Sequence, residues 1–271
     1  MASTIVSAPG QFWLLVRMWI RSTLAYPASF GLMVAGNALV TALDFVAVLI
    51  MFSRIRAFGG FELAEMALLY GTASMALGIA DLAIGSIERI GGRIRSGEVD
   101  VWLVRPVSAF VQAAADQFAL RRLGRPLQAA VVLVIAIPRV DADWSLLKVA
   151  LLAVSMVSGA VIFASIFVMG AALQFIAGDA SEVANSFTYG GQQLTQYPLT
   201  VFGRDILRTV TFVVPLAFVN YYPVLYVLDK PVPLGLPAWT GLLSPLVAMV
   251  VAGLGAIAWR AGLRRYRSTG S

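Results

Sequence analysis

The sequence predicts an all-α integral membrane protein, and its composition, its long apolar runs and its charge distribution all indicate this class. Of the 271 residues, 59% are hydrophobic and only 13% are charged, whereas a soluble domain has roughly 25% charged residues. None of the apolar runs alternates in the manner of a membrane β-barrel strand, so the crossings are predicted to be helical. No repeat or linker divides the chain, and we expect residues 1–271 to form a single transmembrane domain.

Six segments are apolar enough to cross about 30 Å of hydrocarbon, which takes about 20 helical residues. They cover residues 28–52, 67–87, 119–138, 146–175, 204–228 and 239–260. The third segment has only a short apolar core, and the fifth is interrupted by Pro215 and Pro223. We therefore expect six transmembrane helices, of which the fifth is broken.

Residues 9–25 precede these segments and contain arginines inside an apolar run. Arg17 and Arg21 lie one helical turn apart, while Trp13 and Trp19 have the amphipathic rings that are common at headgroup level. This pattern predicts a helix that lies in the membrane interface. The alternative interpretation is that the segment is the ordinary start of the first crossing.

The basic residues are distributed unequally between the two sides that six crossings create. Fifteen of the twenty lysines and arginines fall on the side that holds both termini and the loop after the second crossing. Because positive residues accumulate in the cytoplasm, we expect both termini and this loop to be cytoplasmic. The net charge of +6 then reflects membrane topology, and no nucleic-acid partner is expected because no continuous basic stripe is present.

The residue types that are missing exclude several kinds of chemistry. The chain has no cysteine and no histidine, so we expect no catalytic residue and no metal site built from thiolates or imidazoles. Its two lysines, Lys148 and Lys230, both lie outside the G-x-x-x-x-G-K-[ST] pattern of a phosphate-binding loop. We therefore expect the chain to bind no cofactor itself, and any ATPase that drives it to be a separate protein.

A charged segment, GGRIRSGEVDVWLVRP, follows the second predicted crossing. Its mixture of both charges with a tryptophan is typical of a protein-contact surface, although the arginines alone would also serve to fix the orientation. The residues that we expect to dock a partner are Arg93, Arg95, Gly97, Glu98, Asp100, Trp102, Arg105 and Pro106.

Three stretches carry a resemblance to a known family. Gly97, Asp100, Leu103, Arg105 and Pro106 match a Gly-x-x-Asp-x-x-Leu-x-Arg-Pro pattern. The segment FVVPLAFVNYYPVLYVL, with Pro215 and Pro223, and the ending GLRRYRS, with Gly262, Leu263, Arg264, Tyr266 and Ser268, are also similar to that family. It comprises the permease subunits of type-2 ATP-binding-cassette (ABC) exporters, and the similarity is to a bacterial branch with six crossings.

This resemblance implies a division of labour between chains. Permeases of this kind pair with an identical or homologous permease in the bacterial inner membrane, and each half is attached to a cytoplasmic ABC ATPase that binds ATP and magnesium. Residues 91–105 would form the coupling element, whose movement opens a path through the membrane. The cargo would be an amphipathic molecule such as a drug, a toxin or a lipid.

Polar groups inside the predicted crossings are costly and often functional. Asn37 and Asp44 lie in the first crossing and Asp81 lies in the second, where each is either bonded to a neighbouring helix or exposed to a substrate pathway. Pro215, Asn220 and Tyr221 belong to the broken fifth segment and are further candidates for that pathway. The alternative to this pathway near Asn220 is an interfacial tyrosine belt.

Two other functions compete with the exporter. A proton- or ion-coupled secondary transporter would use Asp44 and Asp81, but such transporters usually have repeats and broken helices in both halves. A membrane enzyme would need a reactive group, and Glu88, Glu98 and Asp100 lie among arginines that lower a carboxyl pKa.

Overall fold

The computed structural model describes residues 7–177 and 181–267, without the side chains of residues 37, 38, 41, 42, 44, 181 and 184. Within this part of the chain the regular structure is helical, apart from one isolated β-bridge between Phe58 and Phe61. The predicted all-α class is therefore confirmed. The α-helices are α1 (Ala8–Leu24), α2 (Pro27–Phe52), α3 (Leu63–Ile84), α4 (Ile90–Arg95), α5 (Glu98–Val104), α6 (Ala109–Ala115), α7 (Gly124–Ala136), α8 (Leu146–Ala177), α9 (Ser181–Thr195), α10 (Arg204–Phe212), α11 (Tyr221–Val227) and α12 (Ser244–Arg265).

Short 3₁₀ segments connect or extend these helices. They are η1 (Gly85–Arg89), η2 (Leu120–Leu123), η3 (Ile137–Arg139), η4 (Leu199–Phe202), η5 (Leu216–Phe218), η6 (Pro233–Gly235) and η7 (Ala238–Leu243). Through η1 and η7, helices α3 and α12 become parts of longer continuous helical runs.

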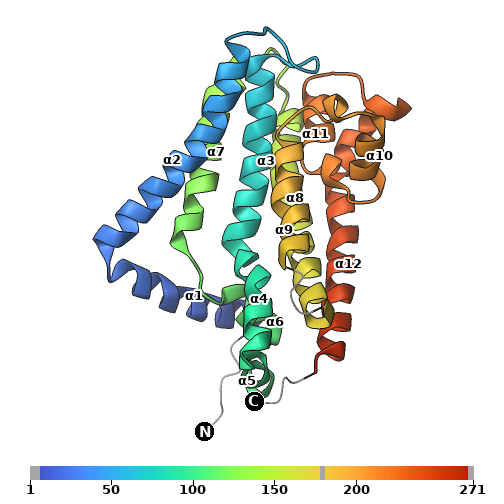
Figure 1. Ribbon diagram of the computed structural model, residues 1–271. Helices are drawn as coiled ribbons and strands as arrows, with labels where there is room; N and C mark the ends of the chain where they lie inside the picture. Colours follow the sequence, from blue (N-terminus) through green and yellow to red (C-terminus); the bar gives the residue numbers. More distant parts are fainter. Residues whose placement is uncertain (1–6, 178–180, 268–271) are drawn as a thin grey trace.

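Three of these runs are long and apolar enough to cross a membrane, namely 63–95, 146–177 and 238–265. A fourth candidate is the pair formed by α10 with residues 216–227, which is bent by 78°. Helices α2 and α7 also run along the bundle (Figure 1). By length and composition, the described residues thus contain three crossings, or four if the bent pair is counted, and the total of six stays a prediction.

Small residues allow the central helices to approach closely. A Cβ atom on Gly262 of α12 would lie 2.8 Å from the carbonyl oxygen of Ala172 in α8, and one on Gly78 of α3 would lie 2.8 Å from Pro126 in α7. In a bilayer, where lipid tails are as apolar as leucine, close van der Waals contact of this kind drives helix association. The core of the protein therefore forms around α3, α8 and α12.

Helix α1 lies across the direction of the bundle, at the end where α4, α5 and α6 are found (Figure 1). It presents large apolar side chains to the surroundings, and the ring of Trp13 is 60% exposed. The residues predicted to form an interfacial helix, 9–25, thus correspond to a separate crosswise helix. We refer to the end of the bundle that carries α1, α4, α5 and residues 260–267 as the basic end, and to the opposite end as the far end.

Residues 204–228, predicted as the fifth crossing, form the bent pair of α10 with residues 216–227, and their assignment as a crossing stays a prediction. Helix α9 runs back along α8 from the basic end, and α10 and α11 both lie at the far end (Figure 1). Polar residues of α9 are bonded to neighbouring elements: Tyr189 Oη donates to Glu88 Oε2 at 3.1 Å, and Gln196, which directly follows α9, donates from Nε2 to Ser74 Oγ at 3.2 Å. Hydropathy did not reveal α9 because these internal bonds make a polar helix acceptable there.

The path of the chain also determines where two arginines lie. Arg204 and Arg208 belong to α10 and therefore lie at the far end, not with the termini as predicted. The distribution of lysines and arginines becomes thirteen against seven. The excess remains at the basic end, and the cytoplasmic location of this end stays a prediction.

Candidate functional site

Residues 90–106 form a compact helical hairpin at the tip of the basic end (Figure 1). Helix α4 ends at Arg95, and Gly97 adopts a left-handed conformation with φ 72° before α5 begins at Glu98. This φ suits glycine because a Cβ atom would meet the following backbone. After Val104 the chain becomes extended at Arg105, as expected before a proline.

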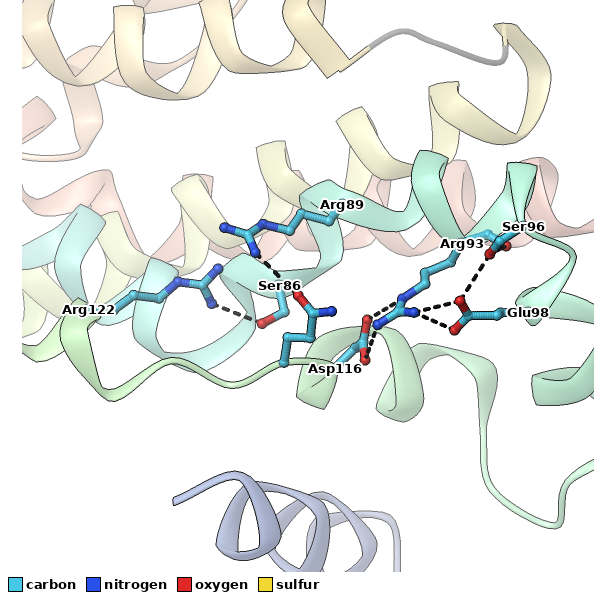
Figure 2. Close-up of polar contacts among 8 residues, drawn as sticks. Ser86, Arg89, Arg93, Ser96, Glu98, Asp116 and Arg122 are labelled. Carbon is cyan, nitrogen blue, oxygen red and sulfur yellow. Dashed lines mark hydrogen bonds and ion pairs between the residues drawn. The ribbon is translucent and has the colours of Figure 1, made fainter. Parts of the chain in front are cut away.

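Arg93 fastens this hairpin from within. Its Nη1 atom donates to Glu98 Oε1 at 2.6 Å, and its Nε atom donates to Asp116 Oδ2 at 2.8 Å (Figure 2). Ser96 Oγ also donates to Glu98 Oε1 at 3.1 Å. These bonds from Arg93 lower the pKa of the Glu98 carboxyl. One guanidinium therefore joins α4, α5 and the residue that follows α6, and we call these contacts the Arg93 clamp.

Two amide side chains attach the hairpin to its neighbours. Gln112 Nε2 of α6 donates to the carbonyl oxygen of Trp102 and to that of Val107, both at 2.9 Å. Gln174 Oε1 of α8 accepts from the backbone N–H of Gly91 at 2.8 Å. Because Gln112 and Gln174 are almost fully buried, these bonds fix the hairpin against α6 and α8.

The end of α12 also contacts the hairpin. Tyr266 Oη donates to Asp100 Oδ1 at 3.0 Å, and the ring of Tyr266 meets the edge of Phe175 in α8 with centroids 5.8 Å apart. Desolvation raises the pKa of the Tyr266 hydroxyl, and its bond to Asp100 adds to the shift. Movement of α5 is therefore linked directly to α12 and α8.

The surface that the hairpin presents differs from the predicted one. Trp102, expected to contact a partner, is 7% exposed and belongs to the main hydrophobic core, and Arg93 is turned inward by its clamp. The exposed side chains include those of the predicted Arg95 and Arg105, and also those of Val104, at 83%, Val101 and Leu103, which were not predicted. We call this surface the α5 tip; it consists of Val101, Leu103, Val104, Arg105 and Pro106, all of which are exposed.

Asp81, a candidate for the substrate pathway, is paired with an arginine. Its Oδ1 atom lies 3.1 Å from Arg122 Nε, and Arg122 Nη1 donates to Ser86 Oγ at 2.9 Å (Figure 2). This geometry matches the partnered-carboxyl interpretation of Asp81. The other two polar candidates, Asn37 and Asp44, belong to α2, but their side chains lie outside the described residues.

Pro215, Asn220 and Tyr221 lie at the bend between α10 and α11. Asn220 is fully buried, and its Nδ2 atom donates to the carbonyl oxygens of Leu69 and Thr195 at 2.9 Å each. Tyr221 is 2% exposed. Asn220 thus holds the bent segment against α3 and α9, and its role in a substrate pathway stays a prediction.

Three residues that hold the hairpin in place were not predicted to do so. Gln112 and Asp116 were expected only to form the polar face of an interfacial helix, and Gln174 is an isolated polar residue within an apolar stretch. The only sequence signal for them is that a polar side chain in such a stretch needs a bonding partner.

The fold and the hairpin define a multi-pass helical membrane protein with a rigid, partly apolar tip beyond one end of its bundle. The chain belongs to a family described as ABC-2 family transporter protein, whose model matches residues 38–270. The comparisons with curated proteins and with solved structures gave no match. Family membership makes the chain an ABC permease subunit, which associates with an ABC ATPase.

Proposed function

We propose that the chain is the membrane subunit of an ATP-driven exporter, moved by a separate cytoplasmic ATPase that docks on the α5 tip. The observation that carries this proposal is the combination of an exposed apolar surface with a rigid support. Val104 is an apolar residue that is 83% exposed. It lies at the basic end, on a hairpin that the Arg93 clamp holds in place. Because the clamp prevents the hairpin from bending relative to the bundle, a force applied to the tip is transmitted to the bundle.

The apolar character of the α5 tip supports a protein partner. The core of a protein interface is more apolar than the rest of the surface and depleted in charge, apart from arginine, and an exposed apolar patch marks an interaction site. Val101, Leu103 and Val104 supply the apolar centre, and Arg105 adds a charged edge. A surface that served only to set the orientation would not need three exposed aliphatic side chains.

The connection to the bundle supports coupling. From the α5 tip, contacts lead through Asp100 to Tyr266 at the end of α12, and from the Tyr266 ring to Phe175 in α8. Since α8 and α12 are two of the three helices that form the core, a displacement of α5 moves elements that run the length of the bundle. We further propose a second permease, identical or homologous, as the partner within the membrane.

The direction, cargo and location of transport belong to the same proposal. We propose that the basic end is cytoplasmic in a bacterial inner membrane, because the basic residues remain more numerous there. The cargo would be an amphipathic drug, toxin or lipid that moves outward. Pairing of Asp81 with Arg122 does not favour a proton-coupled transporter that uses Asp81.

Charge reversal at the α5 tip tests the docking. In cells that contain the cognate ATPase, the tagged permease is purified from membranes, and the ATPase activity that accompanies it is measured. Arg105→Glu is expected to lose most of this activity, because it places a negative charge beside the apolar contact. Arg208→Glu at the far end is the matched control and should retain it. Equal activities with both variants would contradict docking at the α5 tip.

A further inference from the structure

We propose that a pocket at the basic end, separate from the α5 tip, binds a phosphate group, either as a free anion or as the headgroup of an anionic membrane lipid. The pocket has a volume of about 220 Å³ and lies between η1, η2 and the start of α7. Its lining includes four arginines and two carboxylates, so it carries net positive charge. These residues are Arg89, Arg121, Arg122, Arg125, Asp81 and Glu88.

The two carboxylates are bonded in ways that leave positive charge in the pocket. Asp81 is paired with Arg122. Glu88 accepts from two hydroxyl groups, that of Tyr189 at 3.1 Å and that of Thr188 at 3.3 Å. Both hydrogen bonds to Glu88 thus come from neutral groups. The four arginines outnumber the two carboxylates and leave the pocket positively charged.

Arg89 and Arg125 are the donors best suited to an added anion. Arg89 Nη1 makes a long bond of 3.4 Å to Gln117 Oε1, and the Arg125 guanidinium lies over the Tyr189 ring at 5.7 Å. Within the described part of the chain, neither side chain forms an ion pair with a carboxylate. A guanidinium presents planar paired donors that match a phosphate group. Figure 2 shows the side chains of Arg89 and Arg122 close to Ser86.

The depth of the pocket suits a lipid headgroup. Helix α3 has 22 residues and at 1.5 Å per residue spans about 33 Å, close to the hydrocarbon thickness of a bilayer. Arg89 follows this helix and therefore lies near the level of the lipid phosphates. Basic pockets between membrane helices on the cytoplasmic side are known to take anionic headgroups.

An apolar surface for lipid tails lies beside the pocket. Arg121 Nη1 is 3.9 Å from Met33 Sδ of α2, which brings this helix next to the arginines. Leu32 and Met33 are 78% and 45% exposed. A molecule with a phosphate group and an acyl chain would contact both surfaces at once, so a lipid is the source that these positions favour.

Binding is tested on the purified full-length chain in detergent with three probes: phosphatidylglycerol, phosphatidylcholine and sodium phosphate. Thermal-shift titration gives the affinity for each. The double variant Arg89→Gln/Arg125→Gln is expected to bind phosphatidylglycerol about tenfold more weakly or worse, since it loses two charge-assisted donors. Glu88→Gln should bind it more tightly, because it removes a repelling charge from the same pocket. Arg208→Gln at the far end should match the wild type.

The opposite signs separate anion binding from general damage, because a disrupted fold does not tighten binding. If the double variant fails to fold, Arg89→Gln and Glu88→Gln form the same opposed pair. The expected pattern with phosphatidylglycerol supports a lipid site, and the same pattern with sodium phosphate alone supports a site for free phosphate. Equal affinities of the wild type and the pocket variants for every probe would overturn the proposal.

Discussion

Arg93 is the residue on which the shape of the hairpin depends most. It contacts Glu98 in α5 and Asp116 after α6, and its side chain is 23% exposed. Hydrogen bonds between charged groups are stronger than neutral ones, and partial burial reduces their screening by salt. The Arg93 clamp therefore holds α4, α5 and α6 in one fixed arrangement.

Replacement of Arg93 tests this role. Arg93→Gln is expected to destabilise the purified chain by about 1–2 kcal/mol, the range for losing hydrogen bonds to charged groups at a partly exposed site, and to lower its melting temperature. Arg105→Gln, an exposed arginine on the same hairpin, is the control and should have little effect. Equal melting temperatures for the two variants would contradict the clamp.

The loss of stability caused by Arg93→Gln should depend on pH. The pKa of Glu98 is lowered in the folded protein from its ordinary value of 4.5, so its contribution to stability is fully present above that value. It is lost as the pH falls through the lowered pKa. The stability difference between wild type and Arg93→Gln should therefore be constant near neutral pH and shrink in acid.

At the residue scale, the sequence indicated which residues form the hairpin but not which way they face. Trp102 and Arg93 were both predicted to meet a partner, and both are turned inward. The reason is that their partners are not adjacent in sequence: Asp116 lies 23 residues from Arg93, and Gln112, which donates to the Trp102 carbonyl oxygen, lies 10 residues from Trp102. Composition and spacing contain no signal for such pairs.

Among the elements, the turn between α4 and α5 sets the direction of the α5 tip. Gly97 occupies a left-handed conformation there, and its backbone both ends α4 and begins α5. Residues with a Cβ atom are disfavoured in this conformation, although asparagine tolerates it better than most.

The effect of replacing Gly97 should depend on how well the new residue tolerates the left-handed conformation. Gly97→Ala is expected to destabilise the hairpin by about 1–2 kcal/mol and to reduce the ATPase activity that copurifies with the permease. Gly97→Asn should lose less of that activity. The copurified activity of both variants is measured beside the wild type, and an alanine variant that retains more activity than the asparagine variant would contradict the conformational explanation.

The elements also show where hydropathy succeeds and where it fails. The runs around α3, α8 and α12 were located from their apolar composition, and the structure confirms them as candidate crossings. Helix α9 was missed because it is rich in polar residues, two of which, Thr188 and Tyr189, donate hydrogen bonds to Glu88 inside the protein. A polar helix with internal partners is compatible with a membrane, but a single sequence does not reveal those partners.

For the whole molecule, the path of the chain places α10 at the end of the bundle opposite to the chain termini, where the prediction did not place it. The corrected path places Arg208 at the far end and the α5 tip at the basic end. The predicted path and the path in the structure therefore place residue 208 on opposite sides of the membrane. Labelling of intact cells can distinguish the two.

Single cysteines distinguish these two paths, because the chain has no cysteine of its own. Arg208→Cys is expected to react with a membrane-impermeant maleimide added to intact cells. Arg105→Cys should react only after the membrane is permeabilised. Labelling of residue 208 only after permeabilisation would restore the sequence-based assignment and contradict the corrected one.

The central claim is that a separate ATPase moves this bundle by gripping the α5 tip, and the most direct measurement is cross-linking from that tip. Val104→Cys, at the most exposed apolar position of the tip, is combined with a short cysteine-to-lysine cross-linker in membranes that contain the cognate ATPase. The expected result is a covalent adduct with the ATPase whose yield changes when ATP is added. Arg208→Cys is expected to give no adduct. An absence of any adduct from residue 104, with adducts from residue 208 instead, would contradict the account.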